Sequence, residues 1–320
     1  KIIMSQKKII LSIVCRSYNG EKYIYTALKS LADNLNSNCE VIIVDNGSVD
    51  QTLKQIEDFK KKEKYSFILK LIQQENSGPG GSCNTGLDFA KGNYVGFLDC
   101  DDILLNNFEY VFNLIKNDKF DIIEYGFVTF LNEDQINLKK YKSLYNNLEG
   151  EYHLSQILEI IFARTNWYPF IRLYKRILWR NIRFPTDKAY EDDMTIYKVF
   201  LKGSNIFIAN QPVLAYRQHS MSITAKHTVN QLNDLISFYW DLDIKENYKN
   251  IFRLRLARAI SHFSFELGQG KEDYKKISFN QKKYLLDKKT KKILKKVDLF
   301  YYLTPKIYDF VNKLRLNLFR

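Results

Sequence analysis

Apolar and polar positions in the first hundred residues follow two alternating periods. Short, nearly continuous apolar runs predict buried strands, and after most of them the apolar residues recur every three or four positions, as in a helix. The strand-like runs cover residues 9–15, 40–45, 67–72 and 94–99, and helical spacing covers 21–35 and 82–90, with a glycine-rich loop at 76–81. Strands that alternate with helices predict a parallel sheet with right-handed crossovers.

The pattern changes beyond residue 100. Residues 121–130 predict another strand and 154–162 a helix, whereas from about residue 229 strand patterns vanish and helical ones dominate, as in 251–267. We therefore expect an α/β domain over residues 1–225 and a helical region over residues 226–320.

Length and composition narrow the class of protein. A chain of 320 residues can bury a sizeable core. We find neither an apolar run of roughly 18 residues, which a membrane span needs, nor the pattern of a signal peptide. The four cysteines lack metal-ligand spacing and suit buried thiols in a reducing compartment. We expect a cytoplasmic location.

Positive charge is concentrated near the end of the chain. The net charge is +13, and residues 271–320 contain fifteen Lys or Arg against five Asp or Glu. Apolar residues interleave with these lysines, which favours an amphipathic helix on the inner face of an anionic membrane. The alternative is a solvated helical face on a soluble domain. Nucleic-acid binding is a further class, but no motif for it is visible and we do not expect it.

An acidic cluster follows the strand-like run at 94–99. Asp99, Asp101 and Asp102 repel one another and resist burial unless a cation or a ligand compensates them. Ligands bind at the carboxyl ends of strands in an open α/β sheet. The cluster therefore indicates a metal site that faces a phosphate-bearing substrate, and the alternative is an acidic turn that caps the next helix.

Polar residues also follow the other predicted strands. Tyr18 and Glu21 follow the first strand, Asp45 and Asn46 the second, and residues 76–84 the third. All would gather along one edge of the sheet, where an aromatic face, a carboxylate and a helix start suit a nucleotide. Each residue alone is typical of an ordinary turn. Together with the acidic cluster after the fourth strand, however, they make four successive polar groups, which favour a binding site.

Two downstream clusters complete the candidate chemistry. Residues 190–193 (Tyr-Glu-Asp-Asp) either begin a helix or supply a general base, and His219 stands beside Arg217 and Ser220. The phosphate-binding motif Gly-x-x-x-x-Gly-Lys-Ser/Thr is absent, and residues 78–81 do not complete Gly-x-Gly-x-x-Gly. A dinucleotide dehydrogenase therefore has little support.

Over residues 9–222 the chain resembles the family 2, GT-A-fold inverting glycosyltransferases of bacterial polysaccharide and glycan assembly. The order and spacing of several stretches carry the resemblance. They are 12–14 with 17–24, 40–50, 76–80 with 84–87, 92–102, 173–176, 182–185 and 190–193. The resemblance implies a Rossmann-like nucleotide-diphospho-sugar transferase domain followed by the helical region.

The resemblance also implies roles for single residues. The donor nucleotide-sugar, usually UDP-linked, would contact Tyr18, Glu21, Asp45, Asn84 and Asp99. Asp101 of the Asp-x-Asp motif would coordinate Mg²⁺ or Mn²⁺ with help from His219, and Asp192 would be the catalytic base. We expect transfer of a hexose or N-acetylhexosamine to a hydroxyl of a saccharide or lipid-linked glycan. The alternative is a nucleotide-sugar-binding protein without turnover.

Three positions depart from the family pattern. Arg16 replaces a common proline, Asn46 a usual aspartate, and Cys83 a frequent arginine near the expected phosphates. We expect Arg217 or Lys175 to supply the missing cation. The region 154–184 would border the acceptor, with Trp167 and Tyr168 either stacking on a sugar ring or packing in the core.

Overall fold

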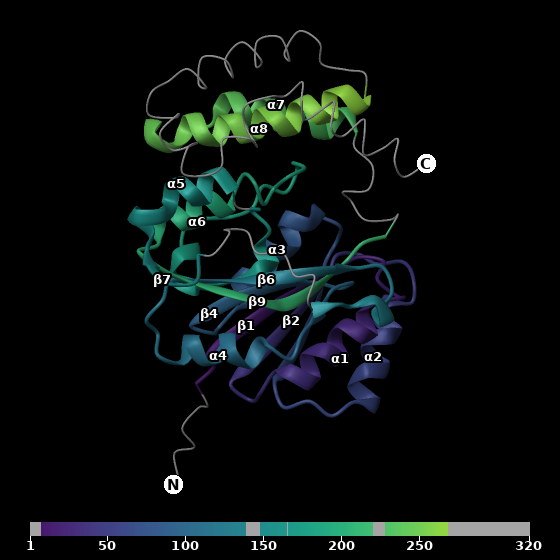
Figure 1. Cartoon of the computed structure of the whole chain (residues 1–320). Helices are drawn as coiled ribbons and strands as arrows, with labels where there is room; N and C mark the ends of the chain where they lie inside the picture. Colours follow the sequence, from purple (N-terminus) through teal and green to yellow (C-terminus); the bar gives the residue numbers. More distant parts are fainter. Residues whose placement is uncertain (1–7, 139–147, 165, 220–227, 268–320) are drawn as a thin grey trace. The chain divides into compact units, whose positions relative to one another are not determined.

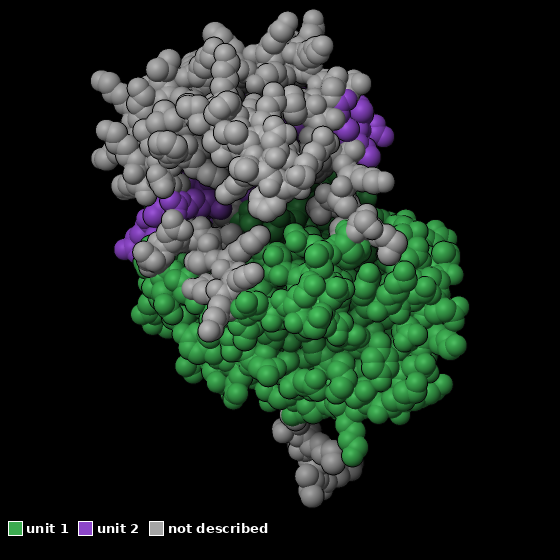
Figure 2. All heavy atoms as spheres, turned by 45° about the vertical axis from the view of Figure 1, so that its right-hand side comes forward, with its two compact units in different colours: residues 1–155, 166–225 green, residues 156–165, 226–320 purple. Residues whose placement is uncertain are grey.

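The computed structural model describes residues 8–138, 148–164, 166–219 and 228–267. The chain divides into two compact units, residues 1–155 with 166–225 and residues 156–165 with 226–320 (Figure 2). The segment 156–165, which we had placed in the α/β domain, groups with the second unit. Our domain limits stay a prediction, and the basic segment 271–320 lies outside the described residues.

In its described residues, the first unit is built on one nine-stranded mixed sheet with the order β3-β2-β1-β4-β8-β6-β9-β5, and β7 pairs with β9. The strands are β1 (Leu11–Ser17), β2 (Cys39–Asp45), β3 (Ile68–Gln73), β4 (Tyr94–Asp99), β5 (Ile103–Leu104), β6 (Ile122–Phe130), β7 (Gly150–His153), β8 (Arg172–Lys175) and β9 (Asn205–Arg217). The four strands predicted in the first hundred residues are confirmed, and they are parallel to one another.

The strand order reverses at β1, which lies between β2 and β4. In doubly wound sheets such a reversal opens a crevice at the carboxyl ends of the strands, because the two connections leave in opposite directions. The register there pairs Arg16 with Asp99 and Ser17 with Asp45. The last residues of three strands therefore meet at one place.

The helices of the first unit are α1 (Ile24–Asn34), α2 (Thr52–Lys62), α3 (Gly78–Phe89), α4 (Phe108–Lys116) and α6 (Ile196–Lys202). In Figure 1, α1, α2 and α4 lie on one side of the sheet and α3 on the other. Side chains alternate along β1: Leu11, Ile13 and Cys15 enter the core that includes α1, whereas Val14 meets α3. Arg16 has the parity of Val14 and therefore points to the α3 side.

Helix α3 begins at Gly78, four residues before the predicted start. The expected glycine-rich loop is largely its first turn, because Pro79 suits the first helical turn and its missing N–H costs no hydrogen bond there. Further along, a Cβ at position 86 would come within 2.1 Å of Val14. Gly86 therefore lets α3 lie close against β1.

The second unit contains most of α5 (Leu154–Arg164) together with α7 (Val229–Asp241) and α8 (Glu246–Leu267). Phe162 of α5 stacks on Tyr248 with ring centroids 5.1 Å apart and meets the ring of Phe252 edge-on. The helices predicted at 154–162 and 251–267 are thus confirmed. Among the described residues we find no helix with the length and apolar character needed to cross a membrane.

Candidate active site

The acidic cluster lies at the carboxyl end of β4. One carboxylate oxygen each from Asp99, Asp101 and Asp102 lies within 4.8 Å of the others. Asp102 is fully buried: Oδ1 accepts a hydrogen bond from the Arg217 backbone N–H, and Oδ2 has no hydrogen-bond partner among the residues that the structure describes. Burial and the neighbouring carboxylates raise the pKa of Asp101 and Asp102. A bound cation would relieve this repulsion, so the cluster fits a divalent metal.

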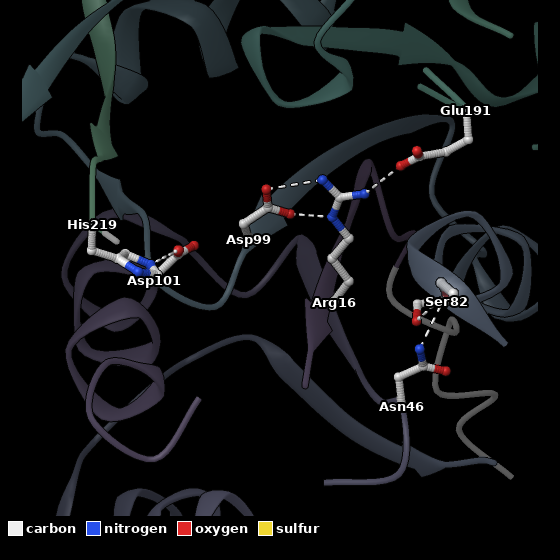
Figure 3. Close-up of polar contacts among 8 residues, drawn as sticks. Arg16, Asn46, Ser82, Asp99, Asp101, Glu191 and His219 are labelled. Carbon is white, nitrogen blue, oxygen red and sulfur yellow. Dashed lines mark hydrogen bonds and ion pairs between the residues drawn. The ribbon is translucent and has the colours of Figure 1, made fainter. Parts of the chain in front are cut away.

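His219 reaches the cluster from the far end of β9. Its Nε2 lies 2.8 Å from Oδ2 of Asp101 (Figure 3). The His219 ring also stacks on Tyr23, with ring centroids 5.2 Å apart. The two predicted metal ligands are thus adjacent although 118 positions separate them in the sequence. Carboxylate oxygens and an imidazole form a donor set suited to Mn²⁺ or Mg²⁺, and the ligand role stays a prediction.

Arg217 contacts the acidic turn that contains Asp101 and Asp102. Its Nε donates to the Asp101 carbonyl at 2.9 Å, and its guanidinium lies between the rings of Tyr23 and Phe130. The same guanidinium pairs with Glu133 at 3.0 Å. Arg217 is therefore near the cluster, as expected, but its contacts hold the turn in shape.

Lys175 is not at this edge of the sheet, so its expected role as the missing cation is wrong. β8 runs antiparallel to β4 and places Lys175 opposite Tyr94, at the start of β4. The lysine pairs there with Asp121 at 3.2 Å. The direction of β8 could not be read from the local sequence.

Arg16, which the sequence showed only as a departure from the family pattern, supplies a cation between Asp99 and Glu191. Its guanidinium pairs with both oxygens of Asp99 and, through Nη1, with Glu191 at 3.1 Å (Figure 3). The buried Cys83 of α3 lies close enough to Arg16 to interact with its charge. A guanidinium from β1 thus occupies the region where an arginine beside Asn84 was expected.

Asp192 follows Glu191 in a segment of turns before α6. Tyr190, just before it, has φ 58°, a left-handed conformation that is costly for a bulky residue. Asp192 is partly buried, and its Oδ1 accepts the Asp193 N–H at 3.0 Å. Burial, then Glu191 and Asp193, raise the pKa of Asp192, and Arg16 opposes them. A carboxylate with a raised pKa is suited to general base catalysis.

The residues expected at the nucleoside lie on the loops after β1 and β2. Tyr18 is 51% exposed, so its ring is accessible for stacking. Asp45 is buried, and its carboxylate accepts hydrogen bonds from the Ser48 hydroxyl at 2.5 Å and the Ser48 N–H at 3.2 Å. Glu21 accepts the Gln51 N–H at 2.9 Å. The two carboxylates are thus already oriented by local contacts, and their donor contacts stay predictions.

The side chains of Asn46 and Asn84 form hydrogen bonds with other groups of the protein. Asn46 donates to Asn76 and the Gly78 carbonyl and accepts from Gln74 and the Ser77 N–H. An aspartate could not donate, which explains the amide at this position. Asn84 exchanges two 2.8 Å hydrogen bonds with the backbone of Phe184. Asn84 therefore ties α3 to the segment before Asp192, and its donor contact stays a prediction.

The two aromatic residues proposed for the acceptor pack among other rings. Trp167 is 1% exposed and meets Phe200 edge-on at 5.5 Å, so core packing is confirmed for it. Tyr168 is partly buried and stacks on Phe170 at 5.1 Å. A sugar platform therefore finds no support at Trp167.

Comparison with known proteins agrees with this geometry. Residues 12–187 match the profile of the family described as "Glycosyl transferase family 2". The match covers more than half of the chain, so the chain belongs to that family, which is an inverting family of glycosyltransferases.

Two curated relatives come from Streptococcus pneumoniae. Glycosyltransferase GlyA is 27% identical over 235 residues, which are 71% of this chain and 33% of GlyA. Glycosyltransferase GlyG is 22% identical over 305 residues, 85% of this chain and 95% of GlyG. The chain thus spans about a third of one relative and nearly all of the other.

Among solved structures, residues 1–349 of TarS from S. aureus in complex with UDP-GlcNAc have a similar fold. The TM-score is 0.65 at 22% identity, covering 86% of this chain and 80% of that one. This likeness, with the family match, confirms the expected GT-A fold.

Proposed function

We propose that this protein is a metal-dependent inverting glycosyltransferase that moves a hexose or N-acetylhexosamine from a UDP-linked donor to a hydroxyl acceptor. The observation that carries the proposal is the convergence of distant segments at the reversal of strand order. Arg16 contacts Asp99 and Glu191 there, His219 contacts Asp101, and carboxylate oxygens of Asp99 and Asp101 lie within 4.8 Å of each other. Family membership supports the reaction class.

The donor would lie across the carboxyl ends of β1, β2 and β4. Tyr18 would stack on the base, Asp45 and Glu21 would accept hydrogen bonds from the nucleoside, and Asp99 would lie near the ribose. Asp101 and His219 would hold Mg²⁺ or Mn²⁺. When bound, such a cation would supply the positive charge that stabilises a departing diphosphate. The UDP-GlcNAc bound by TarS supports a UDP-sugar as donor.

Asp192 would act on the acceptor. Its raised pKa makes the ionised carboxylate a stronger base toward a sugar hydroxyl, and general base catalysis typically contributes about 10²–10⁴-fold to the rate. The oxygen so activated attacks the anomeric carbon opposite the diphosphate, and the configuration inverts. The protein supplies no covalent intermediate in this scheme.

The acceptor would be a saccharide or a lipid-linked glycan. A relative in Campylobacter jejuni, 27% identical over 218 residues, is named "GalNAc(5)-diNAcBac-PP-undecaprenol beta-1,3-glucosyltransferase". That name supports an acceptor carried on a membrane lipid, and with it a cytoplasmic enzyme that binds the inner face of the membrane peripherally.

The proposal is tested by transfer assays on Asp192→Asn. Because this change removes the base but keeps the shape, we expect transfer to fall by about 10²-fold or more while UDP binding by calorimetry is retained. UDP-Glc, UDP-Gal, UDP-GlcNAc and UDP-GalNAc, each with Mg²⁺ and with Mn²⁺, form the donor screen. Loss of UDP binding as well would instead give Asp192 a structural role.

Metal dependence has its own test. We expect EDTA and Asp101→Ala each to abolish UDP release, and Mn²⁺ to restore it only in the chelated wild type. A fully active Asp101→Ala protein would remove Asp101 from the metal site. Tight UDP-sugar binding without turnover under every condition would favour the non-catalytic alternative.

A further inference from the structure

We propose that Arg16 is a positioning residue that ties the acidic cluster at the end of β4 to the segment that carries Asp192. By holding Asp99 and Glu191 at the same time, it fixes the proposed base relative to the donor site. This inference rests on the proposed function, because a base needs positioning only where a transfer reaction takes place.

The contact between Arg16 and Asp99 follows from the register of the sheet. Arg16 and Asp99 are register partners on the parallel strands β1 and β4, so their side chains leave the same face side by side. Nε and Nη2 of the guanidinium each meet one Asp99 oxygen, a bidentate pair. Both side chains are only 20% exposed, so water screens the pair weakly. The guanidinium is therefore held on a rigid element.

The contact between Arg16 and Glu191 joins the sheet to a segment without regular secondary structure. Glu191 lies among the turns that precede α6, and its carboxylate accepts a hydrogen bond from Nη1 of Arg16 at 3.1 Å. The Glu191 side chain is 10% exposed. Because Asp192 is the next residue, any movement of Glu191 would carry the proposed base with it.

Cys83 of α3 stands at the position where a cation was expected. Its thiol is buried, and burial raises its pKa to about 12, so it is neutral under ordinary conditions. A neutral thiol neither repels the guanidinium nor competes with it for Asp99 and Glu191. A lysine at position 16 could supply the charge but not a planar fork that binds two carboxylates at once.

The test compares Arg16→Gln, Arg16→Lys, Glu191→Gln and the double variant Arg16→Gln/Glu191→Gln in the full chain. Arg180→Gln, the same change at an exposed arginine, is the matched control. Transfer kinetics report kcat and the donor KM separately. Hydrogen exchange measured by mass spectrometry over residues 186–195 reports order in the segment without requiring activity.

We expect Arg16→Gln to lower kcat by about 10–100-fold, because misplacement of a reacting group by about 1 Å can cost that much. The donor KM should change less than about threefold, which separates positioning from uniform donor binding. Glu191→Gln should also lower kcat, and the double variant should be no worse than Arg16→Gln, since both changes break the same tie. Arg16→Lys should recover part of kcat, and Arg180→Gln should match the wild type.

Exchange over residues 186–195 should be faster in Arg16→Gln and Glu191→Gln than in the control. Unchanged exchange with normal kcat would overturn the proposal, as would a rise in donor KM alone, which would make Arg16 a donor contact. If the wild type transfers no sugar, the proposed function fails, and the exchange experiment still decides whether Arg16 orders the segment.

Discussion

At the scale of single residues, the charge around Asp192 determines when it can act. Glu191 and Asp193 are its sequence neighbours, and both make it harder for Asp192 to ionise, whereas Arg16 makes it easier. Only the ionised carboxylate can accept a proton from an acceptor. As pH falls through the raised pKa of Asp192, the active fraction decreases, so kcat should decline on the acid side above the usual range for aspartate.

Asp193→Asn tests this balance. The change removes one negative neighbour, keeps the backbone N–H that donates to Asp192, and should therefore lower the pKa of Asp192. We expect the acid limb of the kcat–pH profile to move to lower pH, measured with a saturating UDP-sugar between about pH 5 and 8. Asp187→Asn, an exposed aspartate on the same segment, is the control. A limb that stays in place or moves upward would remove Asp192 from the role of base.

At the scale of elements, a buried ion pair joins β6 to β8. Arg172 and Glu124 lie 2.6 Å apart, Arg172 is fully buried, and its guanidinium also donates to the Tyr168 and Asn166 carbonyls. Removal of one partner from a buried pair leaves a charge without compensation and typically costs about 3–5 kcal/mol. The pair therefore fixes β8 against β6. Because β8 also pairs with β4, it helps to hold β4 in place.

Glu124→Gln should accordingly lower the free energy of unfolding by about 3 kcal/mol, because it leaves the Arg172 charge uncompensated. Urea denaturation followed by circular dichroism measures the loss. The control is Asp58→Asn, which breaks a pair between the partly exposed Asp58 and the exposed Lys62 and should cost less than about 1 kcal/mol. Equal effects of the two changes would show that water screens the Glu124 pair as well.

Local periodicity predicted β1 to β4 because each buried strand carries its own apolar signal. The acidic clusters at 99–102 and 190–193 and the isolated His219 stood out in the sequence, but only the family resemblance singled out Asp101 as metal ligand and Asp192 as base. It could not predict β8 running antiparallel to β4, because long-range pairing leaves no local pattern. The role of Arg16 was missed for the same reason: only the register of β1 against β4 brings it to Asp99.

At the scale of the whole molecule, charge is distributed very unevenly along the chain. Residues 271–320 hold an excess of ten positive charges out of the total of +13. Each basic residue near an anionic lipid surface contributes about 1 kcal/mol of binding, an effect that salt screens. This concentration predicts that the last fifty residues bind anionic membranes, where a lipid-linked acceptor would be found.

Neutralising four lysines of the basic segment should therefore weaken binding to vesicles by about a thousandfold in full-length protein at low salt. The four are Lys288, Lys289, Lys291 and Lys292, each changed to Gln. The matched control neutralises four lysines of the first unit, Lys54, Lys61, Lys62 and Lys64. Flotation with phosphatidylglycerol-containing vesicles, and with neutral ones for comparison, measures the difference.

The control variant should float with anionic vesicles as the wild type does and be released from them at high salt, because electrostatic attraction between exposed charges is screened over about a Debye length. The variant of the basic segment should stay at the bottom of the gradient at all salt concentrations. If both variants lose binding equally, net charge alone attracts the protein to the vesicles. If neither does, the basic segment is a solvated face and the acceptor must be reached without it.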